Sequence, residues 1–333
     1  MNYTEIITSI SNKNLDPVYF LMGNEPYYID KIANAFSHNI LTAEEKAFNQ
    51  VILYAKDTTT AEIIAEAKQF PVGSQKRVVI VKEAQQLKNI ELLETYLENP
   101  QKSTILIISY KGKSIDKRKK FGKNLAKKCV VLESNKLYEN KIPSWISSYV
   151  NENGFTIDNK AIVILAEYLG TDLSNISNEL DKIMLVVRKE EQINTQTIEK
   201  HIGISKNYNV FELQNALGNK DIAKANQIIN YFAKNTKNHH IVPILNSLFS
   251  FFQKIIIYHF LKDKSSQSTA SALKINPFFV RQYQNAAQKY SKRDLFIIFE
   301  YLKEYDLKSK GVNNKSTNQD QLLKEITFKI LHI

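Results

Sequence analysis

Residues 23–30, Gly-Asn-Glu-Pro-Tyr-Tyr-Ile-Asp, follow a short apolar run and precede an amphipathic stretch, which is where a phosphate-binding loop would lie. Such a loop reads G-x-x-x-x-G-K-[ST]: its glycines let backbone N–H groups cradle phosphate, its Lys meets the outer phosphates and its hydroxyl holds Mg²⁺. Tyr28, Ile29 and Asp30 occupy the positions of the second Gly, the Lys and the hydroxyl. Glu25 adds a negative charge that repels phosphate. We therefore expect no nucleotide binding by this mechanism.

Residues 78–84, Val-Val-Ile-Val-Lys-Glu-Ala, have the pattern of the strand that supplies a Mg²⁺ ligand in P-loop ATPases. In an ATPase the charged pair after the apolar run is Asp-Glu, and the Asp serves Mg²⁺. Lys82 takes the place of that Asp here, and a cation neither ligates nor attracts Mg²⁺. We interpret Glu83 as a polar residue at a strand end rather than as a catalytic group.

A basic segment at residues 111–128 is the densest charge run of the chain. Asp116 is its only acidic residue, and its cationic residues are Lys111, Lys113, Lys117, Arg118, Lys119, Lys120, Lys123, Lys127 and Lys128. Runs of this kind contact phosphates without reading sequence. The DNA-backbone candidates are Lys117, Arg118, Lys119, Lys120 and Lys123. The alternative is a solvated helix face, and base stacking is not indicated because Phe121 is the only aromatic residue in the segment.

The sequence gives little indication of a metal site or a disulfide bond. Cys129 is the only cysteine, and none of the six histidines forms an H-x-x-x-H pair. No intramolecular disulfide can form, and we expect neither a metal site nor a cofactor. Cys129 lies in a strand-like run and is interpreted as a small buried apolar residue.

Composition suggests a globular protein of two or three domains. The chain has 333 residues, 43% of them hydrophobic, and a formal net charge of +11. Such a charge fits a polyanionic partner such as nucleic acid, or serves only solubility. We expect no targeting leader. The longest apolar stretch, residues 241–261, is interrupted by polar residues and Pro243, so we expect no membrane span and a cytoplasmic protein.

The first 136 residues alternate strand-like and helix-like segments. Expected strands lie at residues 18–22, 48–54, 77–81, 104–108 and 129–132, with helices at 28–41, 59–68 and 87–98. The strand runs are continuously apolar, which is typical of strands buried on both faces. Their alternation with helices predicts a parallel α/β sheet.

After Glu133 we expect helices only. A small helical unit, residues 137–204, has expected helices at 142–151, 159–169, 172–187 and 194–201. A larger all-α unit, residues 205–333, is helical from Asn209 onward, with breaks at Pro243, at the polar stretch 262–269 and at Pro277.

Several short stretches, in order, carry a family resemblance. They are residues 17–30, 74–84, 167–174, 178–182, 209–213 and 306–308. The ordered set resembles the delta subunit family of the bacterial DNA polymerase III holoenzyme, across nearly the whole chain. No single stretch is specific to this family, but the order of the stretches along the chain is.

The resemblance implies three parts: a degenerate AAA+-like α/β domain at 1–136, a helical lid at 137–204 and a helical collar at 205–333. It also implies a subunit that binds the sliding clamp (the beta subunit) and opens its ring for loading onto primed DNA. Other clamp-loader subunits, joined through the collar, would hydrolyse ATP. The isolated chain would then be no enzyme, although the holoenzyme is a DNA-directed DNA polymerase, a nucleotidyltransferase.

The clamp contact of this family lies at a helix tip just before the third strand, which corresponds to Phe70, Pro71 and Val72. By position the wedge pair falls on Pro71 and Val72. Gly73 stands where a second aromatic residue is common, so this tip is smaller than in its relatives. An exposed apolar tip commonly marks a partner site. The alternative is that Phe70 is the last core residue of its helix.

Two other functions remain open from the sequence. One is an active AAA+ ATPase, which the missing loop residues disfavour and a nucleotide titration would test. The other is a basic protein that binds DNA alone, which would show salt-dependent DNA affinity without clamp affinity.

Overall fold

The computed structural model divides into two compact units, residues 1–137 and 138–333. The structure describes residues 1–203, 205, 208–236, 239–314 and 316–333. The first unit ends beside the position, 136, that the sequence suggests for the end of the α/β domain. The predicted lid and collar both lie in the second unit, and the boundary expected between them falls at residue 204, outside the described residues.

A five-stranded parallel sheet forms the centre of the first unit, in the order β2-β3-β4-β1-β5. Its strands are β1 (Val18–Gly23), β2 (Gln50–Tyr54), β3 (Arg77–Lys82), β4 (Thr104–Lys111) and β5 (Val130–Ser134). The three inner strands are almost wholly buried, as their continuous apolar runs predict. The α/β class with a parallel sheet expected for this part of the chain is confirmed.

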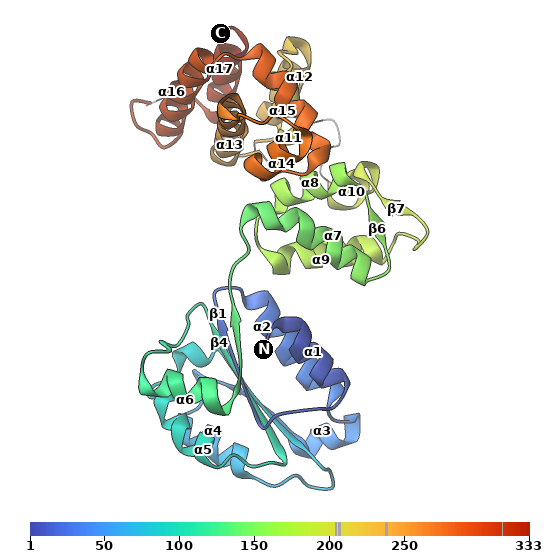
Figure 1. Ribbon diagram of the computed structural model, residues 1–333, viewed down its shortest axis with the longest axis vertical. Helices are drawn as coiled ribbons and strands as arrows, with labels where there is room; N and C mark the ends of the chain where they lie inside the picture. Colours follow the sequence, from blue (N-terminus) through green and yellow to red (C-terminus); the bar gives the residue numbers. More distant parts are fainter. Residues whose placement is uncertain (204, 206–207, 237–238, 315) are drawn as a thin grey trace. The chain divides into compact units, whose positions relative to one another are not determined.

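Helices cover both faces of the sheet (Figure 1). They are α1 (Tyr3–Ser11), α2 (Pro26–Asn39), α3 (Ala43–Asn49), α4 (Thr60–Lys68), α5 (Glu94–Glu98) and α6 (Lys120–Lys128), with 3₁₀ turns η1 (Ala84–Gln86) and η2 (Ile90–Leu93). On one face α1 and α2 bury Ile6, Ile32 and Phe36 against β1 and β4. On the other, α4, α5 and α6 bury a second apolar cluster that includes Ile63 and Leu125.

Two expectations for this unit are wrong. The strand expected from Phe48 begins at Gln50, because α3 precedes it, with Thr42 and Glu45 forming a capping box at its start. The helix expected over 87–98 is instead η2 followed by the short α5. Asn89 adopts a left-handed conformation, with φ of 56°, so a regular helix cannot pass through it. Helix α1 was not anticipated.

The second unit begins with η3 (Glu139–Lys141) and four predicted helices, and it holds one small sheet. The helices are α7 (Ile142–Glu152), α8 (Asn159–Leu169), α9 (Leu173–Met184) and α10 (Thr195–Ile202). The expectation that strands stop after Glu133 is wrong, because β6 (Thr156–Ile157) and β7 (Gln192–Ile193) pair in parallel. Two residues per strand are too few to give a readable apolar pattern.

The remaining elements are helical, as expected. They are α11 (Val210–Gly218), α12 (Ile222–Lys234), α13 (Ile241–Phe260), α14 (Ser266–Leu273), η4 (Pro277–Phe279), α15 (Val280–Lys289), α16 (Lys292–Ser309) and α17 (Gln319–Leu331). Pro243 does not break α13, because it lies in the first turn, where its missing N–H leaves no hydrogen bond unmade.

Helix α13 alone among the described residues is long and apolar enough to cross a membrane, by length and composition. The sequence predicted no membrane span here, because polar residues interrupt the apolar stretch at residues 241–261. Its Ile244, Leu248 and Phe252 are buried, and the helix packs on α15 and α16. We interpret α13 as the central helix of the second unit.

Candidate functional site

The β1–α2 turn, at the position of a phosphate-binding loop, is bonded to the chain itself. Gly23 adopts φ of +132°, and a Cβ there would meet the Ser134 backbone oxygen at 2.0 Å, so only glycine fits. Gly23 N–H donates to the Lys113 carbonyl at 3.0 Å, and Gly112 N–H donates to the Gly23 carbonyl at 2.8 Å. Glu25 N–H donates to the Ser134 carbonyl at 3.1 Å. These contacts tie the turn to the ends of β4 and β5.

The start of α2 already holds an acidic side chain of the chain itself. Glu25 is buried, and its carboxylate accepts from Tyr27 N–H at 3.1 Å as the N-cap of the helix. The N-terminus of a helix favours negative charge and is where a phosphate binds in nucleotide-binding folds. The chain therefore places its own carboxylate where a phosphate-binding loop would place its ligand.

Lys111 fills the neighbouring space at the carboxyl ends of the strands. Its Nζ lies 2.8 Å from Asp30 Oδ1 and 3.0 Å from Glu83 Oε1. Asp30 stands at the sequence position of the Mg²⁺-binding hydroxyl, and Glu83 follows the lost Asp at Lys82. The Lys111–Asp30–Glu83 triad thus puts a cation of the chain beside the sequence positions that serve Mg²⁺ in a P-loop ATPase.

The triad shifts the pKa values of two of its members. Burial lowers the pKa of Lys111, but the carboxylates of Asp30 and Glu83 outweigh it, so that the pKa lies above its ordinary value. A hydrogen bond from Gln85, together with Lys111, lowers the pKa of Glu83. Both groups are therefore charged at neutral pH.

The predicted clamp contact lies in the loop from α4 to β3 and projects into solvent. Phe70 is 74% exposed and Val72 is 64% exposed, while Pro71 is half-buried. Phe70 therefore contributes nothing to the core. Phe48, at the end of α3, is also largely exposed, and sequence reasoning had assigned it to a strand. The next residue along the chain, Asn49, hydrogen-bonds to the Val72 backbone, which places Phe48 near the tip.

Side chains from three other elements donate hydrogen bonds to carbonyls at the C-terminal end of α4. Arg77 donates to the carbonyls of Glu66 and Phe48 at 3.2 and 3.1 Å. Tyr96 Oη donates to the Ala67 carbonyl at 3.2 Å, and Thr104 Oγ1 donates to the Gln69 carbonyl at 3.3 Å. Carbonyls that a helix end leaves without intrahelical partners are thus satisfied by buried groups.

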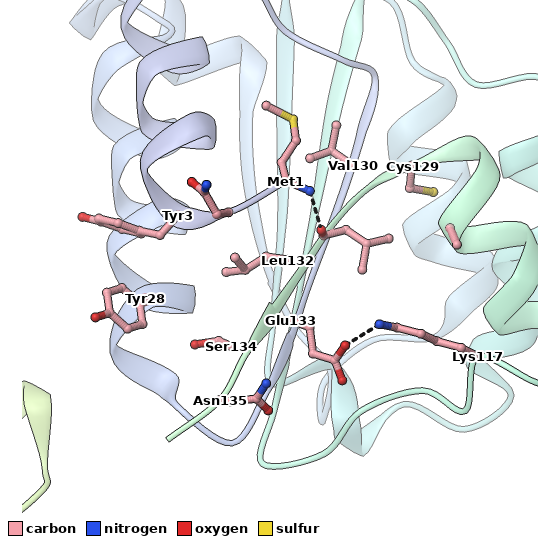
Figure 2. Close-up of a pocket in the computed structure, with 13 residues that line it drawn as sticks. Met1, Tyr3, Tyr28, Lys117, Cys129, Val130, Leu132, Glu133, Ser134 and Asn135 are labelled. Atoms are coloured by element: carbon pink, nitrogen blue, oxygen red, sulfur yellow. Dashed lines mark hydrogen bonds and ion pairs between the residues drawn. The ribbon is translucent and has the colours of Figure 1, made fainter. Parts of the chain in front are cut away.

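The basic segment is partly neutralised by acidic side chains, from within the segment and from elsewhere in the chain. Lys117 pairs with Glu133 on the edge strand β5, beside an open hollow that Figure 2 shows. Lys120 Nζ lies 3.6 Å from Glu94, and Arg118 pairs with Asp116 at 2.9 Å. Within the described part of the chain, Lys119 and Lys123 have no ion pair.

Comparisons with known proteins bear on the whole chain. The model of the family described as DNA polymerase III, delta subunit, matches residues 19–135, and that of its C-terminal domain matches residues 207–326. Together the two cover more than half of the chain. The chain belongs to the DNA polymerase III delta subunit family.

Named relatives agree with this family membership. The DNA polymerase III subunit delta of Bacillus subtilis (strain 168) is 24% identical over 318 residues, 92% of this chain and 91% of the relative. A probable DNA polymerase III subunit delta of Aquifex aeolicus (strain VF5) is 23% identical over 310 residues, 88% of this chain and 86% of the relative. The solved Bacillus subtilis DNA clamp loader delta protein has a similar fold, with a TM-score of 0.56 at 23% identity, covering 99% of this chain and all of that one.

For this member of the delta family, the sequence predicted that the phosphate-binding loop is lost. It did not predict the ion pairs of Lys111 beside that loop. Lys111 counted only as part of a basic segment, and nothing local set it apart from Lys113. The available signal was its position directly after the apolar run of β4, because the carboxyl ends of neighbouring parallel strands meet at one edge. Asn49 carried no signal, since its partner lies 23 residues away.

Proposed function

We propose that this chain binds the sliding clamp and opens its ring for loading onto primed DNA, without hydrolysing ATP itself. The observation that carries the proposal is the exposed apolar tip at Phe70, Pro71 and Val72, on a helix end fixed by buried hydrogen bonds. A small apolar wedge on a rigid support is the form that interface hot spots take, because it fills a pocket at low cost in ordering.

The filled site at the β1–α2 turn supports a role without ATP turnover. A nucleotide would have to displace the Glu25 carboxylate from the start of α2 and the Lys111 ammonium from Asp30 and Glu83. Each displacement leaves a charge without its partner. The subunit would act by binding alone, shifting the clamp toward the open ring by its higher affinity for that form.

The second unit supports the proposed contacts with other clamp-loader subunits. Its helices α13, α16 and α17 expose aromatic side chains, namely Phe249, Phe260, Phe296 and Phe328. Exposed apolar residues in such number often belong to protein interfaces. We propose that the predicted collar, residues 205–333, uses them in a hetero-oligomer, and that the complex works on DNA in the cytoplasm.

A second candidate is a protein that binds DNA alone through its basic segment. Lys119 and Lys123 favour it, since neither is paired in the described chain. The ion pairs of Lys117, Arg118 and Lys120 weigh against it, because phosphate contact would first have to compete with them.

The test is binding of the cognate clamp by the purified chain in the absence of nucleotide. We expect a stable complex, and release of closed clamps from circular DNA when the chain is added without ATP. A chain that binds DNA with a steep salt dependence but shows no affinity for the clamp would support the second candidate instead. If clamp binding required ATP, the inference that the chain's own side chains occupy the nucleotide site would be wrong.

A further inference from the structure

Asn49 forms a buried latch on the tip. It is the last residue of α3 and is fully buried. Its Oδ1 accepts from Val72 N–H at 2.7 Å, and its Nδ2 donates to the Val72 carbonyl at 2.9 Å. The side chain amide thus pairs with both backbone groups of one residue, as a neighbouring strand would.

The latch is itself fixed. Asn49 Nδ2 also donates to the Glu45 carbonyl at 3.1 Å, one turn back in α3, so both of its N–H groups are used. Arg77 holds the adjacent Phe48 carbonyl at 3.1 Å and the Glu66 carbonyl of α4 at 3.2 Å. Val72 is therefore connected through α3 and Arg77 to the helix that carries the tip.

Apart from the latch, few contacts hold the middle of this loop: Ser74 hydrogen-bonds to Glu45 of α3, and Pro71 is half-buried. Residues 69–76 contain no helix or strand, and Gly73 adopts φ of +62°, a conformation open to glycine at little cost. Phe70 and Val72 expose most of their side chains, so burial does not hold them in place. The two buried hydrogen bonds from Asn49 are the contacts that act on the Val72 backbone itself.

We propose that Asn49 is a positioning residue for the clamp contact: it holds Val72, and with it the tip, in the conformation that binds. The inference rests on the proposed function of the tip. Asn49 is buried and can touch no partner, so it can act only by lowering the cost of ordering the loop on binding. Ordering each side chain on binding lowers affinity by roughly twofold to tenfold.

The test is a double-mutant cycle in clamp affinity, with Asn49→Ala and Phe70→Ala in the full chain. We expect Asn49→Ala to weaken binding threefold to tenfold, as the ordering cost of one or two side chains implies. In the Phe70→Ala background the same change should cost clearly less, because the latch then positions a tip without its main anchor. Hydrogen exchange should show faster exchange of the Val72 amide in Asn49→Ala.

Ser134→Ala is the matched control, since it also removes a buried hydrogen bond from a side chain to a carbonyl, at the opposite edge strand. It should leave clamp affinity unchanged. If Asn49→Ala does not fold, the isosteric Asn49→Asp takes its place in the cycle: it keeps the acceptor for Val72 N–H but loses the donors to the Val72 and Glu45 carbonyls, so we expect a loss of clamp affinity here too.

The possible outcomes distinguish the proposed function of the tip from the proposed positioning role of Asn49. If Phe70→Ala and Asn49→Ala both bind normally, the proposed function of the tip is wrong. If Phe70→Ala loses affinity while Asn49→Ala, or Asn49→Asp, does not, the tip stands and the latch is overturned. Equal costs in both Phe70 backgrounds would also overturn it, since a merely structural role lowers the folded fraction regardless of the tip.

Discussion

The β1–α2 turn and the α4–β3 tip lie at different places on one α/β unit and have opposite characters. At the turn, charged groups pair within the chain: Glu25 caps α2, and Lys111 joins Asp30 to Glu83. At the tip, the backbone is satisfied, but the side chains of Phe70 and Val72 face solvent. The difference is consistent with the proposed function, in which the tip and not the turn would contact another molecule.

The largest effect should come from Phe70→Ala. It removes the largest exposed side chain of the tip, and truncation of a hot spot costs about 2 kcal/mol or more, roughly 30-fold in clamp affinity. Val72→Ser should cost less, because a smaller apolar side chain is lost. Surface plasmon resonance with the immobilised clamp measures both, with circular dichroism to check folding. Normal binding by both variants would move the clamp contact to another surface.

Lys111→Met should break the closed turn without touching the tip. The variant leaves Asp30 and Glu83 facing each other without a cation, at a site between exposed and buried. We expect a loss of about 1–2 kcal/mol, between the values for surface and buried pairs. Urea unfolding followed by hydrogen exchange of the β1 and β4 amides would locate the loss in the first unit. Unchanged exchange there would mean that the triad is incidental.

The same variant should change the pH dependence of stability. The pKa of Glu83 is lowered by Gln85 and Lys111, so its contribution is present above the unfolded value near 4.3 and is lost as pH falls through the folded value. The pKa of Lys111 is raised, so its contribution is present below about 10.4 and is lost as pH rises through the folded value. The difference between wild type and Lys111→Met should therefore be constant near neutral pH and shrink in acid.

Removal of the unpaired lysines should change DNA binding by the assembled complex. Lys119→Ala with Lys123→Ala should reduce the slope of log affinity against log salt by about 2 if both contact duplex phosphates. Lys117→Ala with Lys120→Ala is the matched pair, and we expect a smaller change because Glu133 and Glu94 already neutralise these residues. Identical slopes for wild type and both variants would make the segment a solvated face.

ATP should produce the smallest effect, namely none. A ligand that binds only the folded state raises its stability in proportion to the logarithm of its concentration. Thermal unfolding with and without about 1 mM Mg-ATP should therefore give one curve. An upward shift, or turnover that persists through repurification, would mean that the turn opens.

The sequence determined the parallel sheet, because continuous apolar runs between helical segments can be buried only as inner strands. The sequence also predicts that Tyr28, Ile29 and Asp30 do not form a phosphate cradle and that Lys82 does not ligate Mg²⁺, since both roles depend on side-chain type. Only the tertiary structure decided that Phe70 faces solvent, because an apolar residue at a helix end fits a core and a surface equally well. Likewise, the partners of Lys111, Lys117 and Asn49 lie far along the chain, and local patterns carry no record of such contacts.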